Sequence, residues 1–144
     1  MRPILLNSCA VAATAAEARF RIDRPISGRA ALVVALDDEA AEVVDRVAER
    51  PWRGARFVHA DAWKPDELTD TDVVVMIATA DADGAVAAAI ARGCGERGIM
   101  TAGLILGDRL DVAAAVSALR PYARNLMVTD DEDDVAEVLT ALRA

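Results

Sequence analysis

Aromatic residues and lysine are scarce in this chain, and each scarcity excludes something. Only 3% of the 144 residues are aromatic although 54% are hydrophobic, so the core must consist mainly of Ala, Val, Leu and Ile. Side chains that small suit alanine-rich helices packed closely on a sheet. Lys64 is the only lysine, which excludes a lysine-based phosphate site at every other position.

Cysteine is scarce too, because Cys9 and Cys94 are the only two and provide neither a metal-binding spacing nor a disulfide framework. A reducing compartment is then the default, and we expect a cytoplasmic protein. Residues 1–18 resemble a short signal peptide in their apolar centre, but Asn7 and Ser8 interrupt the apolar run early. No apolar run reaches the ~18 residues of a transmembrane helix, so we expect no contact with a membrane.

Basic residues are outnumbered by acidic ones, 16 against 24, which gives a formal net charge of −8. Nucleic-acid binding requires a basic surface that neutralises phosphates, so we expect no nucleic-acid partner. An acidic balance mainly favours solubility and indicates no particular ligand.

Apolar segments of strand length alternate with segments of helical periodicity from residue 30 onward. Residues 30–36 form a continuous apolar run, typical of a strand buried on both faces. Asp37 or Asp38 can cap the helix that follows, which ends before Pro51. Residues 72–79 are the most β-branched stretch and predict the central strand. The remaining predicted elements are strands at 55–60, 99–107 and 125–129, a helical turn at 65–68, and helices at 83–98, 108–123 and 131–144.

Alternating strands and helices predict right-handed βαβ units. We therefore expect a single three-layer Rossmann-like α/β domain over residues 1–144, with a mostly parallel sheet of about five or six strands. Residues 1–29 leave two alternatives open. They form an extra strand and a helix capped by Ser8, or an arm that packs on a partner subunit, and a homo-oligomer is the expected assembly.

Aspartates occur in each loop that follows a predicted strand. Ligands of open parallel sheets bind outside the C-terminal ends of the strands, which makes these loops the expected site. Asp is also a preferred helix cap, so a structural role competes with binding at each position. The expected ligand-binding residues are Thr79, Asp81, Asp83, Gly84, Gly107 and Asp108.

The segment TADADG, residues 79–84, opens a predicted helix where α/β proteins place phosphate loops. A phosphate loop needs glycines so that backbone N–H groups can approach the oxygens. This segment has one glycine, and the carboxylates of Asp81 and Asp83 would repel a phosphate unless a divalent cation lay between them. The chain has neither G-x-G-x-x-G nor G-x-x-x-x-G-K-[ST]. A capping turn that can also touch a ligand is the better interpretation.

His59 is the only histidine and could form an acid–base group with Asp61 and Asp37 at adjacent strand ends. An enzyme on this plan would also use Asp81 and Asp108, with Mg²⁺ offsetting the carboxylates. The chain shows no diagnostic metal-ligand spacing, so we assign no metal site and no cofactor.

Three other features have a structural explanation that we favour. Cys94 lies late in its helix and is expected to be buried and inert. The acidic cluster 130–134 matches no calcium loop and is expected to be a solvated helix start. Trp52 and Trp63 flank the second strand and could cover the sheet edge or contact a subunit.

Residues 66–135 resemble the second half of the tubulin/FtsZ GTPase core. The segment TDVVVMIAT looks like the strand before the glycine-rich G-G-G-T-G-T-G signature of that family, and GAVAAAIARGCGERGIMTAGLIL looks like the helix and strand after it. Only Gly84 could match the signature, and the N-terminal nucleotide loop has no counterpart before Asp37. The resemblance implies a member that has lost GTP hydrolysis and tight GTP binding.

The leading hypothesis is therefore a non-hydrolytic small-ligand-binding or regulatory module. It rests on a regular Rossmann-like pattern without a catalytic or phosphate-loop motif. The alternatives are a small enzyme that uses the Asp and His groups at the strand ends, and a structural partner in a larger assembly that binds through its alanine-rich N-terminal segment.

Overall fold

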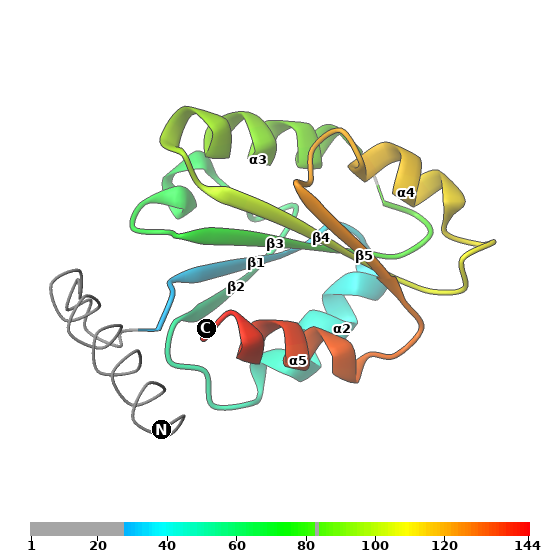
Figure 1. Ribbon diagram of the computed structural model, residues 1–144, viewed down its shortest axis with the longest axis horizontal. Helices are drawn as coiled ribbons and strands as arrows, with labels where there is room; N and C mark the ends of the chain where they lie inside the picture. Colours follow the sequence, from blue (N-terminus) through cyan, green and yellow to red (C-terminus); the bar gives the residue numbers. More distant parts are fainter. Residues whose placement is uncertain (1–27, 83) are drawn as a thin grey trace, which may run out of the picture.

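Five parallel strands form one sheet in the order β2-β1-β3-β4-β5 (Figure 1). The structure is a computed structural model that describes residues 28–82 and 84–144, so nearly all of the strand and helix expected within residues 1–29 lies outside the described part. The strand predicted at residues 72–79 is indeed the central one. The strands are β1 (Ala31–Ala35), β2 (Ala55–His59), β3 (Val73–Ala78), β4 (Met100–Leu106) and β5 (Asn125–Thr129).

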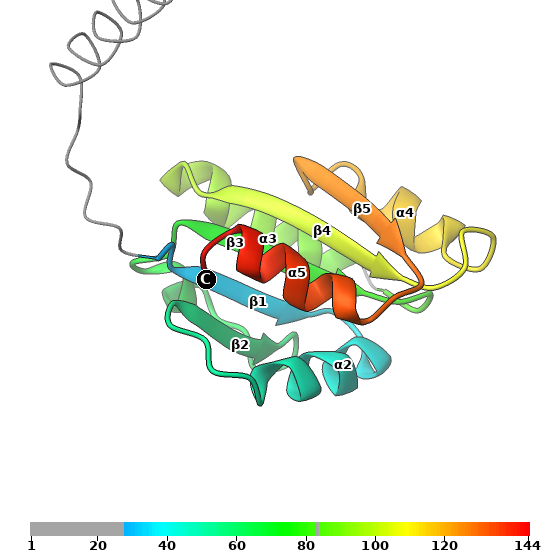
Figure 2. The same cartoon turned by 60° about the horizontal axis from the view of Figure 1, so that its bottom comes forward.

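Helices cover both faces of the sheet. Helices α3 and α4 lie on one face, and α2 and α5 lie on the other (Figure 1, Figure 2). The three layers confirm the predicted α/β fold, and the strand order is one of the two common doubly wound orders, in which the connections change direction between β1 and β3. The helices are α2 (Asp38–Ala48), the 3₁₀ turn η1 (Pro65–Leu68), α3 (Gly84–Arg97), α4 (Ala113–Leu119) and α5 (Asp133–Ala141).

Strands β1 and β3 form the centre of the core, and every residue in them is buried. Successive side chains of a strand point to opposite faces of the sheet, so Leu32 and Val34 pack toward α3 and α4 while Val33 and Ala35 pack toward α2. This two-sided burial explains why residues 30–36 form an uninterrupted apolar run.

The ends of three helices depend on local hydrogen bonds. Gly98, at φ +67°, ends α3, and the N–H of Ile99 then donates to the carbonyl of Cys94. Helix α4 begins later than predicted because the Asp108 carboxylate accepts from the N–H of Leu110 and holds a turn there. Similarly, the Asp131 carboxylate accepts from the N–H of Asp133, and α5 begins at Asp133.

The two tryptophans cover opposite faces of the sheet beside the edge strand β2. Trp52 packs on the α2 side and donates from Nε1 to the carbonyl of Val47 at 2.8 Å. Trp63 packs on the other side, against the cluster that contains Leu68. Of the two roles expected for these residues, covering the sheet edge is the one seen within the chain.

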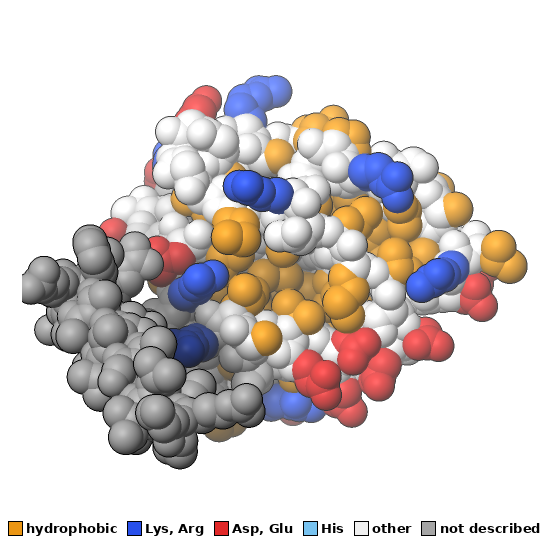
Figure 3. All heavy atoms as spheres, viewed as in Figure 1, with side chains coloured by type: hydrophobic (Ala, Val, Ile, Leu, Met, Phe, Trp, Pro, Cys, Tyr) orange, Lys and Arg blue, Asp and Glu red, His pale blue; other side chains and the backbone are white. Residues whose placement is uncertain are grey.

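The opposite edge of the sheet carries exposed hydrophobic side chains. Met100 and Met127 are 38% and 39% exposed, on the face of the sheet that α2 and α5 cover elsewhere. Figure 3 shows hydrophobic side chains gathered over β4 and β5 between α4 and α5, with acidic side chains beside them near the start of α5. We call this surface the β4–β5 patch; it consists of Met100, Ala102, Leu106 and Met127.

Candidate ligand site at the C-terminal edge of the sheet

Asp37 joins the C-terminal ends of β1 and β3. It is the N-cap of α2, and its Oδ1 accepts from the N–H of Ala40 at 2.8 Å. The same carboxylate accepts from the N–H of Thr79 at 2.6 Å and from the Thr79 hydroxyl at 2.7 Å. Since Thr79 directly follows β3, these bonds, which we call the Asp37–Thr79 clasp, close the switch point between the two strands.

The clasp occupies the position at which a doubly wound sheet most often receives an anion. Free backbone N–H groups at a helix N-terminus attract phosphates and carboxylates. Here the carboxylate of Asp37 uses the N–H groups of Ala40 and Thr79. The structure thus brings together Asp37, a predicted catalytic residue, and Thr79, a predicted ligand-binding residue. The two residues are hydrogen-bonded to each other.

His59 is placed by helix α2 rather than by the loop that follows β2. Its Nε2 lies 2.8 Å from Oδ1 of Asp45, a residue that the sequence analysis did not single out. Asp61 is exposed in the turn after β2. Among the described residues, no hydrogen bond joins His59 to Asp37 or Asp61, so the acid–base group remains a prediction.

Ala80 and Asp81, which follow β3, form a turn. The N–H of Ala82 faces the carbonyl of Thr79 at 3.4 Å, and Asp81 is exposed. Asp83 lies outside the described residues. Gly84 begins α3, where a Cβ would meet Ala118 at 3.5 Å, an ordinary contact distance. Packing alone therefore does not require glycine at position 84.

A cavity of about 380 Å³ opens at the C-terminal ends of β4 and β5. Gly107 and Asp108, both predicted ligand-binding residues, contribute to its wall. Gly107 has φ +143°, and its N–H donates to the carbonyl of Thr129 at 2.9 Å, which ties the two strand ends together. The cavity is lined by Gly107, Asp108, Arg109, Val128, Thr129 and Asp130.

Arg109 is the basic residue of this cavity, and the sequence analysis did not single it out. Within the described part of the chain its guanidinium has no ion-pair partner, and it also lines an adjoining apolar groove of about 450 Å³ between α4 and β5. In the sequence, Arg109 is marked only by its position directly after Asp108, and a basic residue at such a position is also typical of a solvated loop. The groove is lined by Arg109, Ala113, Val116, Leu126 and Val128.

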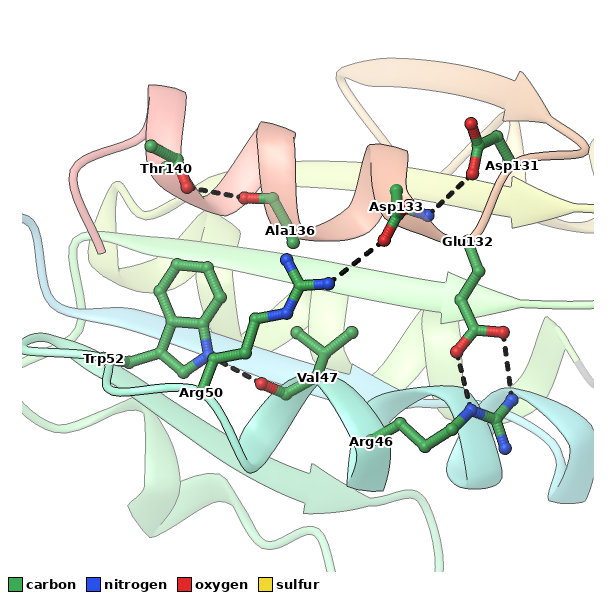
Figure 4. Close-up of polar contacts among 9 residues, drawn as sticks. All are labelled: Arg46, Val47, Arg50, Trp52, Asp131, Glu132, Asp133, Ala136 and Thr140. Carbon is green, nitrogen blue, oxygen red and sulfur yellow. Dashed lines mark hydrogen bonds and ion pairs between the residues drawn. The ribbon is translucent and has the colours of Figure 1, made fainter.

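The acidic cluster 130–134 is partly neutralised by helix α2. Arg46 binds Glu132 through two hydrogen bonds of 2.6 and 3.0 Å, and Arg50 binds Asp133 at 3.0 Å (Figure 4). The hydrogen bond and the charge of Arg46 lower the pKa of Glu132. The predicted solvated helix start is therefore also a link between α2 and α5. Among the described residues, no group of three or more His, Cys, Asp or Glu side chains is arranged to hold a metal ion.

Cys94 is buried, as expected. Burial raises the pKa of its thiol to about 11, although the nearby charge of Arg97 acts in the opposite direction. The thiolate is the reactive form of cysteine, so this residue is chemically quiet near neutral pH.

Comparisons with known proteins add little to this geometry. No family model and no curated protein matches the sequence. One similar solved structure is that of a flavodoxin from the domain Archaea, with 12% identity and a TM-score of 0.40 over 78% of this chain and 92% of that one. The resemblance to the tubulin/FtsZ family remains a prediction. None of the described helices has the length and apolar composition needed to cross a membrane.

Proposed function

We propose that the protein is a non-hydrolytic ligand-binding or regulatory module that takes a small polar ligand at the C-terminal ends of β4 and β5. The observation that carries the proposal is the cavity beside Gly107, where Arg109 has no ion-pair partner among the described residues. Concave sites with a few convergent polar groups are the usual form of small-molecule sites.

The charged groups of the cavity suggest the chemistry of the ligand. A guanidinium presents several donors to a carboxylate or phosphate. Asp108 and Asp130 beside it favour an amino or hydroxyl group instead. A zwitterion or a hydroxylated acid satisfies both requirements, whereas a polyphosphate would meet repulsion from the two carboxylates.

The non-hydrolytic part of the proposal is supported by the Asp37–Thr79 clasp. An anion bound at the switch point would have to displace a carboxylate that already accepts three hydrogen bonds. His59, the predicted acid–base residue, is hydrogen-bonded to Asp45 on α2.

The test is a thermal-shift screen against amino acids, hydroxy acids, sugar phosphates, nucleotides including GTP and GDP, and divalent metals. A ligand that binds only the folded state at about 100 times its Kd should stabilise the protein by about 2.7 kcal/mol. Arg109→Gln and Asp108→Asn should each weaken the shift. Arg120→Gln, an exposed arginine after α4 that does not line the cavity, is the matched control and should leave it unchanged.

Other results would favour the alternatives. Nucleotide turnover that is lost in Asp83→Ala or His59→Ala would contradict a non-hydrolytic module and support the enzyme. A shift with GTP that depends on Thr79 rather than Arg109 would support the tubulin-like resemblance. No shift with any compound would favour an assembly partner.

The homo-oligomer remains a proposal with its own measurement. Light scattering of the full chain across a range of concentrations should give a mass above the 15.2 kDa of one copy. A mass that stays at one copy over that range would exclude the homo-oligomer.

A further inference from the structure

Within residues 28–82 and 84–144, no helix covers the β4–β5 patch on the side of the sheet where α5 lies. In Figure 2, α2 and α5 lie over the other strands of this face, and no labelled helix lies over β5. Met127 stands opposite Leu104 in the register, so its side chain lies on the same face as Met100. Met100 lies four residues before Leu104 on β4, about 13 Å along the strand, so the two exposed methionines mark the two ends of an apolar strip rather than a contact pair.

The charge around the patch argues against a second acidic body as its occupant. Residues 1–27 contain four arginines and two acidic residues, a net charge of +2, so residues 28–144 carry −10 of the total of −8. Figure 3 shows acidic side chains beside the patch near the start of α5 and Lys or Arg side chains beside its opposite end. Two copies meeting through this face would bring together two bodies that each carry a net charge of −10 over residues 28–144, which is unfavourable.

The N-terminal segment has the complementary properties. Residues 3–16 contain no charged side chain and include Ile4, Leu5 and Leu6, and three of the four arginines, Arg19, Arg21 and Arg24, follow them. An apolar stretch flanked by arginines, in a segment of net charge +2, is complementary to an apolar surface on a body of net charge −10.

The segment is also long enough to reach the patch. Ala31 pairs with Val73, and Val73 with Met100, so the start of β1 lies two strands from Met100, about 10 Å away. Residues 17–27 alone can span up to about 36 Å when extended. A tethered segment also acts at a high effective concentration.

We propose that residues 3–16 cover the β4–β5 patch of their own chain. The cover would protect the two exposed methionines and keep the apolar face from other proteins. The proposal does not rest on a ligand in the cavity beside Gly107, because that cavity and the patch share no residue.

The test is oxidation of individual methionines in the full-length protein by hydrogen peroxide, followed by mass spectrometry. Leu5→Asp combined with Leu6→Asp should speed oxidation of Met100 and Met127 about tenfold if the patch is covered about nine-tenths of the time. Met76 is fully buried and should stay slow, which shows that the variant remains folded. Ala12→Asp is a second variant with the same expectation.

Controls separate the occupants. Leu110→Asp changes a side chain that is 87% exposed and outside the patch, and it should not alter the rates. Protection that persists on dilution supports a cover from the same chain, whereas protection lost on dilution would assign it to a second copy and overturn the proposal. Equal oxidation in the wild type and both N-terminal variants would overturn it as well.

Discussion

Asp37 combines two roles that are usually separate, a helix cap and a link between strands. The cap bond to Ala40 is worth about 1 kcal/mol by analogy with other N-caps. The two bonds to Thr79 are charge-assisted and join segments 42 residues apart. A short polar side chain at this point therefore stabilises both the helix and the centre of the sheet.

Asp37→Ala should lower the free energy of unfolding by roughly 2 kcal/mol, because it removes the cap and leaves the donors of Thr79 without their partner. Urea denaturation measures this loss. The vacated N–H groups should also bind an anion, so phosphate should stabilise this variant more than the wild type.

Asp38→Ala is the control for that experiment, since Asp38 is the exposed first residue of α2 and belongs to no clasp. Phosphate stabilises most proteins nonspecifically, and the control measures that effect. If phosphate stabilised both variants equally, this would contradict an anion site at the N–H groups that Asp37 occupies in the wild type.

Cys94 should resist alkylation in the folded protein. With a pKa raised to about 11, only about one thiol in a thousand is ionised at pH 8, and the side chain is buried as well. In a Cys9→Ser background, Ellman's reagent should detect no thiol until denaturant is added. Rapid labelling of the native protein would show that α3 opens readily.

Gly107→Ala should destabilise the protein by roughly 1–3 kcal/mol, because φ +143° is unfavourable for alanine. The new Cβ would also stand 2.7 Å from Cγ1 of Val112. Thermal melting is the measurement. Gly95→Ala is the matched control: a Cβ there meets nothing within 4 Å on helix α3, so the control should stabilise the helix by up to about 1 kcal/mol.

At the scale of the element, the interiors of strands and helices followed from the sequence, whereas several helix ends did not. Period and apolar length identify an element because burial imposes them. The starts of α4 and α5 depend on whether Asp108 and Asp131 bond to a nearby N–H, and the same residues could equally well have capped a helix. Strand order was also inaccessible, because it is set by packing between distant segments.

From the sequence, only those residues of the candidate site that directly follow a strand could be predicted. Gly107 and Asp108 were expected because ligands gather at the C-terminal ends of strands, and a cavity does open there. The pairing of His59 with Asp45 could not be inferred, because it requires knowing which face of α2 lies against β2. Arg109 was missed for a related reason: only the cavity distinguishes it from a solvated arginine.

The ion pairs between α2 and α5 give a pH-dependent contribution to stability. Arg46 lowers the pKa of Glu132, so the pair stabilises the folded state above the ordinary pKa of glutamate. The contribution is lost as the pH falls through the lowered pKa. Glu132→Gln should therefore be less stable than the wild type near neutral pH, and this difference should shrink as the pH is lowered, as measured by urea midpoints over a series of acidic pH values.

The contribution should be small and sensitive to salt, because both side chains are substantially exposed. Glu137→Gln, an exposed residue later in α5, has no described ion pair and serves as the control. If the difference in stability between the wild type and Glu132→Gln grew as the pH fell, it would contradict a lowered pKa for Glu132.

At the scale of the molecule, protection from solvent falls from the centre of the sheet to its β5 edge. All residues of β3 are buried, while Asn125 and Met127 of β5 are exposed. Amides of β3 should exchange with solvent only through global unfolding, and those of β5 at least about tenfold faster. Hydrogen exchange followed by NMR measures both, and equal protection of the two strands would contradict a gradient.

The Asp37–Thr79 clasp also limits where a diffusible ligand can change the state of the molecule. A diffusible metabolite reports its own abundance because it leaves when it is diluted, whereas a carboxylate attached to the backbone is present at the same effective concentration at all times. The occupancy of the junction between β1 and β3 therefore does not depend on the concentration of a free metabolite. Under the proposed function, a ligand would act at the cavity beside Arg109 and not at the junction of β1 and β3.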